Sequence, residues 1–204
     1  MTTSITTATI YGPDTFRTMP WRNGLGTTIE LLKQDLPHGD GFAWRLSMAD
    51  VNTDGEFSNF SGYDRTLLLL DDNGQGNSLI LDCAGVPQRL DKPLQAARFR
   101  GEDSTFATLP DGPVRDFNIM TQRQHCAARV SSAVQPAEST IDVAADILMV
   151  YAVAGELGMN GDDFTELKLP AGHLCVLRNP ATASLHCGGA SHIVIQITYH
   201  RSSS

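Results

Sequence analysis

The residues best suited to contact a small molecule begin in segment 19–30, MPWRNGLGTTIE. Two glycines flank Leu25, and glycine lets a backbone turn tightly or approach another group closely. The hydrogen-bonding side chains around them are Asn23, Thr27, Thr28 and Glu30. The segment is not a P-loop, because the closing Lys-Ser/Thr is absent. Two interpretations stay open: a polar loop beside a ligand, or a tight turn into an edge strand with Trp21 as a core anchor.

Residues 42–49, FAWRLSMA, alternate large apolar and small residues as a β-strand does. Trp44 lies on the large apolar face, whereas Arg45 and Ser47 share the other face with two alanines. An arginine among small side chains inside a barrel is a suitable carboxylate anchor, because its planar guanidinium pairs with both oxygens. The alternative is that this face meets water, and the alternation does not decide between the two.

Two further segments place charged or amide side chains on apolar strands. Arg65 leads into the leucine run 67–70, and in segment 112–120, GPVRDFNIM, the side chains of Asp116 and Asn118 share one strand face. They either line a cavity with Arg45, or Asp116 forms a structural ion pair with Arg115 or Arg65. The ion pair is the favoured interpretation for Asp116, because buried carboxylates are rarely unpaired.

The six histidines and four cysteines give no metal-ligand pattern. No histidines have ligand spacing with one another, and no CxxC pair occurs. We therefore expect no metal or other cofactor, and we expect free cysteine thiols in or near the core.

Composition narrows the function classes. The chain has 204 residues, 41% hydrophobic and 19% charged, with a formal net charge of −8 at pH 7. Acidic charge without basic runs argues against nucleic acid as a partner. The start of the chain shows no secretory signal, and no apolar stretch reaches the roughly 20 residues of a membrane helix. We expect a cytoplasmic protein with no membrane partner.

Short apolar or alternating runs separated by turn residues predict an all-β fold. Residues 67–70 and 147–153 are apolar on both faces, which predicts central strands covered on both sides. The polar segment 135–143 is predicted to link a first half, 1–134, to a second, 144–204, packed as one unit. The predicted strands are 27–33, 43–49, 66–71, 78–82, 97–99, 105–109, 114–121, 127–132, 147–154, 164–167, 174–178, 183–186 and 193–199, with one turn at 14–18.

The second half resembles cupins. The turn Pro170-Ala171-Gly172 before an apolar strand resembles the opening of the second cupin motif, and Gly155-Glu156 resembles the end of the first. The usual cupin metal set of three histidines and a glutamate is missing.

Four segments, PWRNGLGTTIE, WRLSMADV, GEFSNFSGYDRTLLLL and GPVRDFNIM, together resemble the HutD/Ves-like family in order and separation. The resemblance is strongest over residues 16–120. It implies a bicupin fold, with cupin-like double-stranded β-helix barrels and usually no metal ligands. It also implies a place in bacterial histidine utilisation, with no established enzyme activity. The motif-matched residues are Trp21, Asn23, Gly24, Gly26, Thr27, Thr28, Glu30, Trp44, Arg45, Ser47, Phe57, Gly62, Arg65, Arg115, Asp116 and Asn118.

We therefore expect a regulatory protein of histidine utilisation that binds a small carboxylate such as urocanate or N-formylglutamate. Arg45 or Arg65 would bind the carboxylate. The other expected ligand-binding residues are Asn118, Ser47, Thr27, Asn23, Glu30 and Asp116, with Trp44 or Phe57 as an aromatic wall. The alternatives are a cupin-type enzyme acting on a small carboxylate, metal-dependent or not, and a pure interaction protein. No base with an orienting partner is identifiable, so we do not expect catalysis. Exposed strand edges would permit a homodimer.

Overall fold

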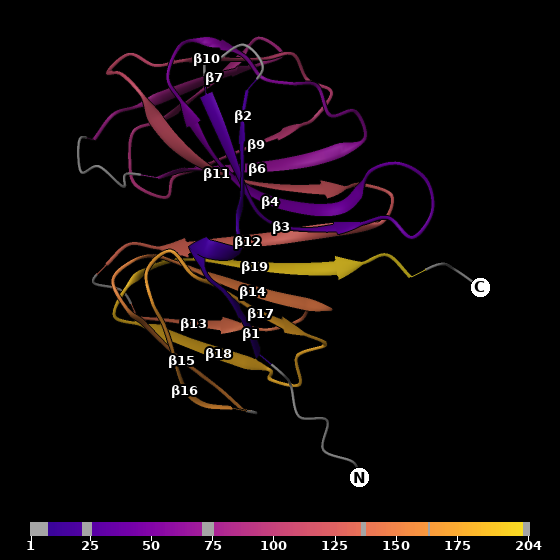
Figure 1. The fold of residues 1–204 in the computed structure, drawn as a ribbon, viewed down its shortest axis with the longest axis vertical. Helices are drawn as coiled ribbons and strands as arrows, with labels where there is room; N and C mark the ends of the chain where they lie inside the picture. The colour runs from indigo at the N-terminus through magenta and orange to yellow at the C-terminus, as the bar shows by residue number, and fades with distance from the viewer. Residues whose placement is uncertain (1–7, 22–25, 71–75, 136–137, 163, 202–204) are drawn as a thin grey trace. The chain divides into compact units, whose positions relative to one another are not determined.

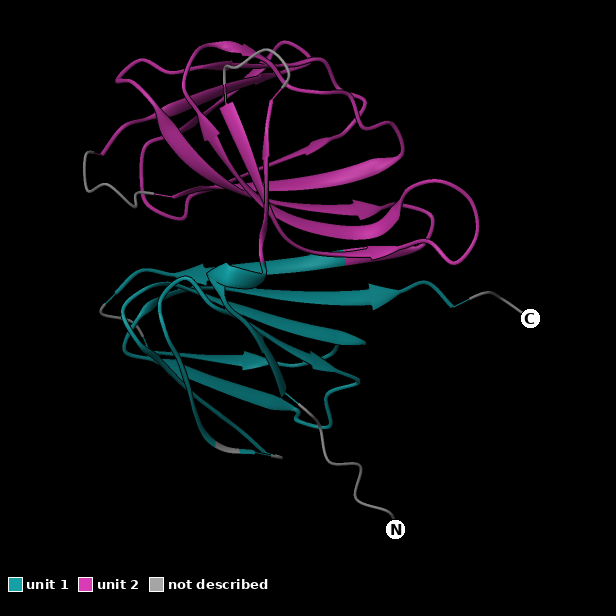
Figure 2. Ribbon diagram, viewed as in Figure 1, with its two compact units in different colours: residues 1–15, 128–204 teal, residues 16–127 magenta. Residues whose placement is uncertain are grey.

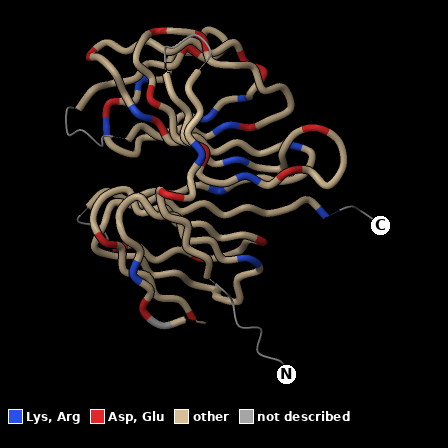
Figure 3. The backbone as a smooth tube through the Cα atoms, viewed as in Figure 1, with Lys and Arg blue, Asp and Glu red and all other residues tan. Residues whose placement is uncertain are grey.

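The computed structural model describes residues 8–21, 26–70, 76–135, 138–162 and 164–201. These residues form β-strands and one short 3-10 helix, Pro13–Thr15, with no α-helix among them (Figure 1). The all-β prediction is therefore confirmed. No helix in the described ranges is long and apolar enough to cross a membrane. The chain divides into two compact units, residues 16–127 and residues 1–15 with 128–204 (Figure 2). We call them the central unit and the split unit. Acidic and basic residues are interspersed along both (Figure 3).

The central unit contains the segments that the sequence singled out. Its described strands form a six-stranded sheet, β2–β3–β4–β11–β6–β9, and a four-stranded sheet, β5–β10–β7–β8, with antiparallel neighbours. The strands are β2 Arg17–Pro20, β3 Gly26–Asp35, β4 Phe42–Val51, β5 Gly55–Glu56, β6 Tyr63–Leu70, β7 Leu79–Cys83, β8 Val86–Leu90, β9 Ala96–Arg100, β10 Thr105–Thr108 and β11 Val114–Gln122.

The two sheets of the central unit enclose an apolar core at one end of β6. Leu67 and Leu69 of β6 pack there with Leu79 and Leu81 of β7. All four leucines of the run 67–70 are at most 5% exposed, so the prediction that both faces of this strand are covered is confirmed. Burying a leucine side chain contributes about 1.5–3 kcal/mol, so each leucine of this run adds to the stability of the unit.

The split unit has an apolar core, and its described buried polar side chains include Thr182, His192 and Gln196. Its described strands form two sheets, β1–β17–β14–β19–β12 and β13–β18–β15–β16, and residues of both meet in that core. The strands are β1 Ala8–Tyr11, β12 Cys126–Ala133, β13 Glu138–Asp142, β14 Ile147–Ala154, β15 Leu157–Gly161, β16 Phe164–Leu169, β17 Leu174–Arg178, β18 Ser184–Gly188 and β19 Ser191–Tyr199. All four cysteines of the chain are free and buried, as predicted.

Strand pairing divides the chain differently from the sequence-based halves. β1 pairs with β17, with Ala8 opposite Leu177, which joins the start of the chain to its last third. Within the predicted linker 135–143, β13 pairs with β18, with Glu138 opposite Gly188. β1 and β13 thus join the two different sheets of the split unit, each through a partner far away in the sequence, whereas the expected division followed chain order.

Candidate ligand-binding site

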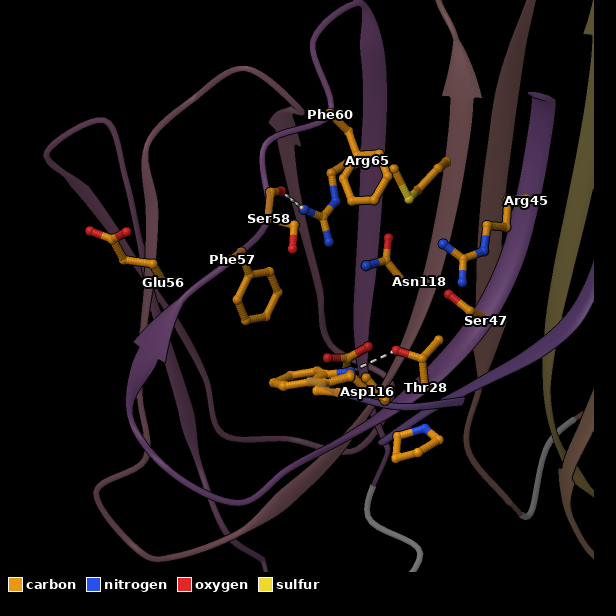
Figure 4. Close-up of a pocket in the computed structure, with 14 residues that line it drawn as sticks. Thr28, Arg45, Ser47, Glu56, Phe57, Ser58, Phe60, Arg65, Asp116 and Asn118 are labelled. Atoms are coloured by element: carbon orange, nitrogen blue, oxygen red, sulfur yellow. Dashed lines mark hydrogen bonds between the residues drawn. The ribbon is translucent and has the colours of Figure 1, made fainter. Parts of the chain in front are cut away.

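A cavity of about 500 Å³ lies in the central unit, within the size range of small-molecule sites (Figure 4). One wall is the inner face of the six-stranded sheet, and another is the segment that follows β5. The lining residues are Pro20, Trp21, Thr28, Arg45, Ser47, Ala49, Glu56, Phe57, Ser58, Phe60, Arg65, Asp116, Asn118 and Met120.

The cavity-lining residues of the six-stranded sheet lie in three rows, which are set by the register of its strands. In the first row, Met120 of β11 stands opposite Arg65 of β6 on one side and Arg45 of β4 on the other. In the second row, Asn118 stands opposite Leu67 and Ser47. The third row is formed by Asp116 and Ala49 with Thr28, which faces Ala49 from β3. Successive rows are about 6.7 Å apart along the strands. The side chains of Arg65 and Arg45 therefore lie at one end of a polar path, and the carboxyl group of Asp116 lies at the other end.

Arg65 is held in an aromatic cage. Its side chain is buried, and its Cζ lies 5.3 Å from the ring centre of Phe57, 5.7 Å from that of Phe60 and 4.8 Å from that of Phe99. At these distances a guanidinium is attracted to the ring faces. Its Nη1 donates a hydrogen bond to the Ser58 carbonyl oxygen at 3.4 Å.

The charge of Arg65 persists in spite of its burial. Desolvation lowers the pKa of its guanidinium to about 10, although the charge of Asp116 opposes this shift. The group is therefore still a cation at neutral pH. Its Nε is buried and has no hydrogen-bond partner among the described residues, so a donor remains for an incoming acceptor.

Arg45 has a partner of its own. Its Nε lies 2.9 Å from Glu30 Oε2, and both side chains are 14% exposed. The same Nε has no hydrogen-bond partner in the described part of the chain, so the contact is an ion pair without hydrogen-bond alignment. Glu30 therefore offsets the charge of Arg45 and leaves donor capacity on the guanidinium.

Asp116 and Asn118 supply buried acceptors. Asp116 is 1% exposed and Asn118 is 7% exposed, and the Oδ1 atom of each has no hydrogen-bond partner among the described residues. Burial raises the pKa of the Asp116 carboxyl group to about 7, with Arg65 acting in the opposite direction. Arg115 pairs with Asp50 instead of Asp116. Of the two partners considered from the sequence, Arg65 is the one whose charge favours ionised Asp116.

The segment from Phe57 to Phe60 forms a wall of the cavity because backbone contacts hold it. The Phe57 N–H donates to the Thr105 carbonyl oxygen at 2.9 Å, and the Phe60 N–H donates to that of Gly101 at 2.8 Å. A Cβ atom on Gly101 would lie 2.1 Å from the Phe60 carbonyl oxygen. Only glycine therefore permits this approach, which fixes two rings of the Arg65 cage.

Trp21 forms part of another wall. Its indole Nε1–H donates to Thr28 Oγ1 at 2.8 Å, which fixes the ring at the third row. The Trp21 N–H donates to the Gly26 carbonyl oxygen at 2.9 Å. The first polar segment thus contributes an aromatic face to the cavity.

The structure brings together most of the residues predicted from the sequence. Arg45, Ser47, Arg65, Asp116 and Asn118 all line the cavity, and Glu30 reaches it through Arg45. Asn23 lies outside the described residues.

Thr27 and Trp44 are not brought to the cavity. Each alternates with a lining residue, Thr28 and Arg45 respectively, so each occupies the opposite face of its strand. Trp44 is completely buried there.

Sequence reasoning considered Phe57 as an aromatic wall, but it missed the contribution of Ser58 and Phe60 to the arginine site. Ser58 and Phe60 carry no charge or periodic pattern, so only long-range contacts place them over Arg65. The available signal was the FSNF sequence at residues 57–60, whose two phenylalanines precede Arg65 by eight and five positions.

No group of three or more His, Cys, Asp or Glu side chains in the described ranges is placed to hold a metal ion.

The fold is that of bicupin proteins. A bacterial pirin from Escherichia coli, solved in complex with nickel(II), superposes with a TM-score of 0.62 over 96% of this chain and 100% of its own, at 8% identity. HutD from Pseudomonas fluorescens SBW25, solved in a formate condition, superposes with a TM-score of 0.81 over 96% of this chain and 100% of its own, at 28% identity.

The sequence profile of the HutD family matches residues 13–195, and the chain belongs to that family. The resemblance predicted from the motifs is thereby confirmed. An uncharacterised protein from the hutC 3′ region of Pseudomonas putida is 41% identical over 112 residues, which are 55% of this chain and 57% of that protein. Protein Ves of Citrobacter koseri is 34% identical over 146 residues, 70% of this chain and 73% of its own. The first of these alignments thus spans less than two thirds of the relative.

Proposed function

We propose that this chain is a carboxylate-binding regulatory protein of histidine utilisation that senses or limits the level of an intermediate such as urocanate or N-formylglutamate. The observation that carries the proposal is the direction of two guanidinium groups, those of Arg45 and Arg65, into one cavity. Arg65 supports it most, because it is buried and keeps an unpartnered Nε. A carboxylate binds such a desolvated cation more strongly than one in water.

The relatives support the biological setting. The Pseudomonas putida relative is described by its location in the hutC 3′ region. HutD of Pseudomonas fluorescens was solved in a formate condition, which makes formate a natural probe for this cavity. We place the protein in the cytoplasm with a small carboxylate as its ligand and without nucleic acid or membrane as a partner. Its exposed strand edges leave a homodimer compatible with this role.

The binding step is tested by thermal-shift titration of metal-stripped protein with urocanate, N-formylglutamate, histidine, glutamate and formate. A ligand at 100 times its Kd stabilises the folded state by about 2.7 kcal/mol. This corresponds to a rise in melting temperature of roughly 5–10 °C for a protein of this size. Arg65→Met should abolish the rise and Arg45→Met should reduce it.

The matched control is Arg100→Met, which removes an exposed arginine from β9 of the same sheet. This variant should keep the full rise in melting temperature. If no acid raises it, or if Arg65→Met retains the rise, the carboxylate site is not where we place it.

The regulatory step is tested in cells of the native host growing on histidine. A chromosomal Arg65→Met allele should reproduce the effect of deleting the gene on expression of the histidine-utilisation enzymes. Normal expression in that strain, with the variant protein folded and present, would show that regulation does not depend on Arg65 in the cavity.

A second candidate function is a cupin-type enzyme acting on the same small acids, and one observation favours it. Asp116 lies in the cavity, and burial raises the pKa of its carboxyl group to about 7, which suits a general acid or base. Proton NMR of urocanate or N-formylglutamate incubated with the protein distinguishes the two functions. Turnover that is lost in Asp116→Asn would favour the enzyme, and unchanged spectra with saturable binding would favour the regulator.

A further inference from the structure

The polar atoms that face the cavity are complementary to more than a carboxylate. The two arginines provide donors, but the Oδ1 atoms of Asp116 and Asn118 are acceptors without a hydrogen-bond partner in the described part of the chain. Both residues are more than nine-tenths buried and both line the cavity. Each Oδ1 atom is itself buried, and a buried acceptor without a partner costs free energy. A ligand with an N–H group beside it supplies the missing donor, whereas a ligand without one leaves the oxygen desolvated and unpaired.

The charges of the cavity lead to the same requirement. Glu30 is ion-paired with Arg45, and Arg65 and Asp116 act on each other electrostatically. A ligand that brings only a carboxylate adds a negative charge to a nearly balanced set and repels the Asp116 carboxylate. An N–H group directed at Asp116 or Asn118 reduces that repulsion by donating to the acceptor oxygens.

The row arrangement gives the relative positions of these groups. The two arginines flank the first row, Asn118 stands in the second and Asp116 in the third (Figure 4). A carboxylate bound by Arg65 therefore places the next few atoms of a small ligand beside Asn118. A longer ligand extends toward Asp116, because the rows are about 6.7 Å apart.

We propose that the cavity selects small acids that also carry an N–H donor, such as an amide, a ring N–H or an ammonium group. The Oδ1 atoms of Asn118 and Asp116 accept the hydrogen bond from this donor. The inference rests on the proposed function, because it assumes that the carboxylate binds at the arginines. It adds a chemical requirement that simple carboxylic acids such as formate, acetate or glutarate do not meet.

Two pairs of ligands that differ by one N–H test the inference on the unmodified protein. N-acetylglycine and acetoxyacetate differ by N–H against O close to the carboxylate. The 3-(pyrrol-2-yl)acrylate and 3-(furan-2-yl)acrylate pair differs in the same way farther from it. Calorimetric titration at pH 8 should give a Kd at least tenfold lower for the N–H member of one pair or both, because the oxygen analogue leaves a buried acceptor facing another acceptor.

Variants then show which residue accepts the hydrogen bond from the ligand N–H group. Asn118→Ala should bring the Kd ratio of the shorter pair close to one, and Asp116→Ala should do so for the longer pair. Asp35→Ala, which removes an exposed carboxylate from the end of β3, should leave both ratios unchanged. Tryptophan fluorescence of each variant, compared with the unmodified protein, establishes that the central unit is folded, since Trp21 and Trp44 both lie in it.

The outcomes separate this inference from the proposed function. Equal Kd values within both pairs would overturn the donor requirement and leave the carboxylate site intact. Absence of binding by all four acids, in a protein that also fails to bind urocanate and N-formylglutamate, would overturn both. A preference that persists in both alanine variants would overturn the assignment of Asn118 and Asp116.

Discussion

The ionisation of Asp116 should be measurable in the stability of the central unit. Its side chain is 1% exposed, and burial raises the pKa of its carboxyl group from 3.8 to about 7. In the unfolded chain the pKa returns to about 3.9. Between pH 4 and 7 the folded state therefore binds more protons than the unfolded state. Stability should fall as the pH rises through this window and level off above it.

The size of the effect follows from the pKa difference. About three pKa units at 1.36 kcal/mol each correspond to about 4 kcal/mol, more than half of which is lost between pH 5 and pH 8. Asp116→Asn removes the titration and preserves the shape of the side chain. The free energy of unfolding of the variant relative to the unmodified protein should therefore rise by roughly 2–3 kcal/mol over that range. The variant also removes the carboxyl group that interacts with Arg65. This lowers the free energy of unfolding by the same amount at each pH, so it does not change the slope.

Urea denaturation followed by tryptophan fluorescence is the appropriate measurement. The chain has two tryptophans, Trp21 and Trp44, and both lie in the central unit, so the signal reports on that unit alone. Asp35→Asn, at an exposed carboxylate of the same unit, is the control for the amide substitution itself. A difference between Asp116→Asn and the unmodified protein that changes by less than about 0.5 kcal/mol from pH 5 to pH 8 would refute the reasoning from burial.

Three further predictions concern packing. Gly101→Ala should destabilise the central unit by at least about 2 kcal/mol in urea denaturation and weaken acid binding, because the new Cβ would lie 2.1 Å from the Phe60 carbonyl oxygen. Unchanged stability would show that the backbone relaxes freely there. Trp21→Phe should lower the free energy of unfolding by about 1 kcal/mol, because the hydrogen bond to Thr28 is lost. Urea denaturation followed by circular dichroism measures this change. Burial raises the pKa of all four cysteine thiols, so a thiol reagent at pH 8 should label the native protein slowly and label four thiols once it is unfolded. Rapid labelling of native protein would contradict that burial.

The strands that could be predicted are those with a strong apolar pattern. The bounds of β14 and β17 were predicted to the residue, because both are long apolar runs ended by turn residues. β8 was missed because it contains Pro87 and exposed polar residues, which are compatible with a strand only at the edge of a sheet. β1 and β13 were missed because their pairing partners lie far away in the sequence.

The candidate site was predictable to the extent that it depends on alternation within one strand. The period of two placed Arg45 with Ser47, and Asp116 with Asn118, on faces that the structure directs into the cavity. Which residues of β3 face the cavity depends on the register of β3 with β4, and this register cannot be derived from the sequence alone. Thr27 was therefore predicted as a lining residue, whereas the structure places Thr28 there. The cage around Arg65 depends on loop contacts that have no periodicity.

The path of the chain through the two units has a consequence for folding during synthesis. The central unit is one continuous segment, so its strands can pair before the rest of the split unit has been completed. β1 is made before the central unit, but its partner β17 ends at Arg178. β1 must therefore stay unpaired until the central unit and β17 have been made. A chain that stops early would release a cavity-bearing central unit with an exposed strand edge at its start, which is a site for aggregation or proteolysis.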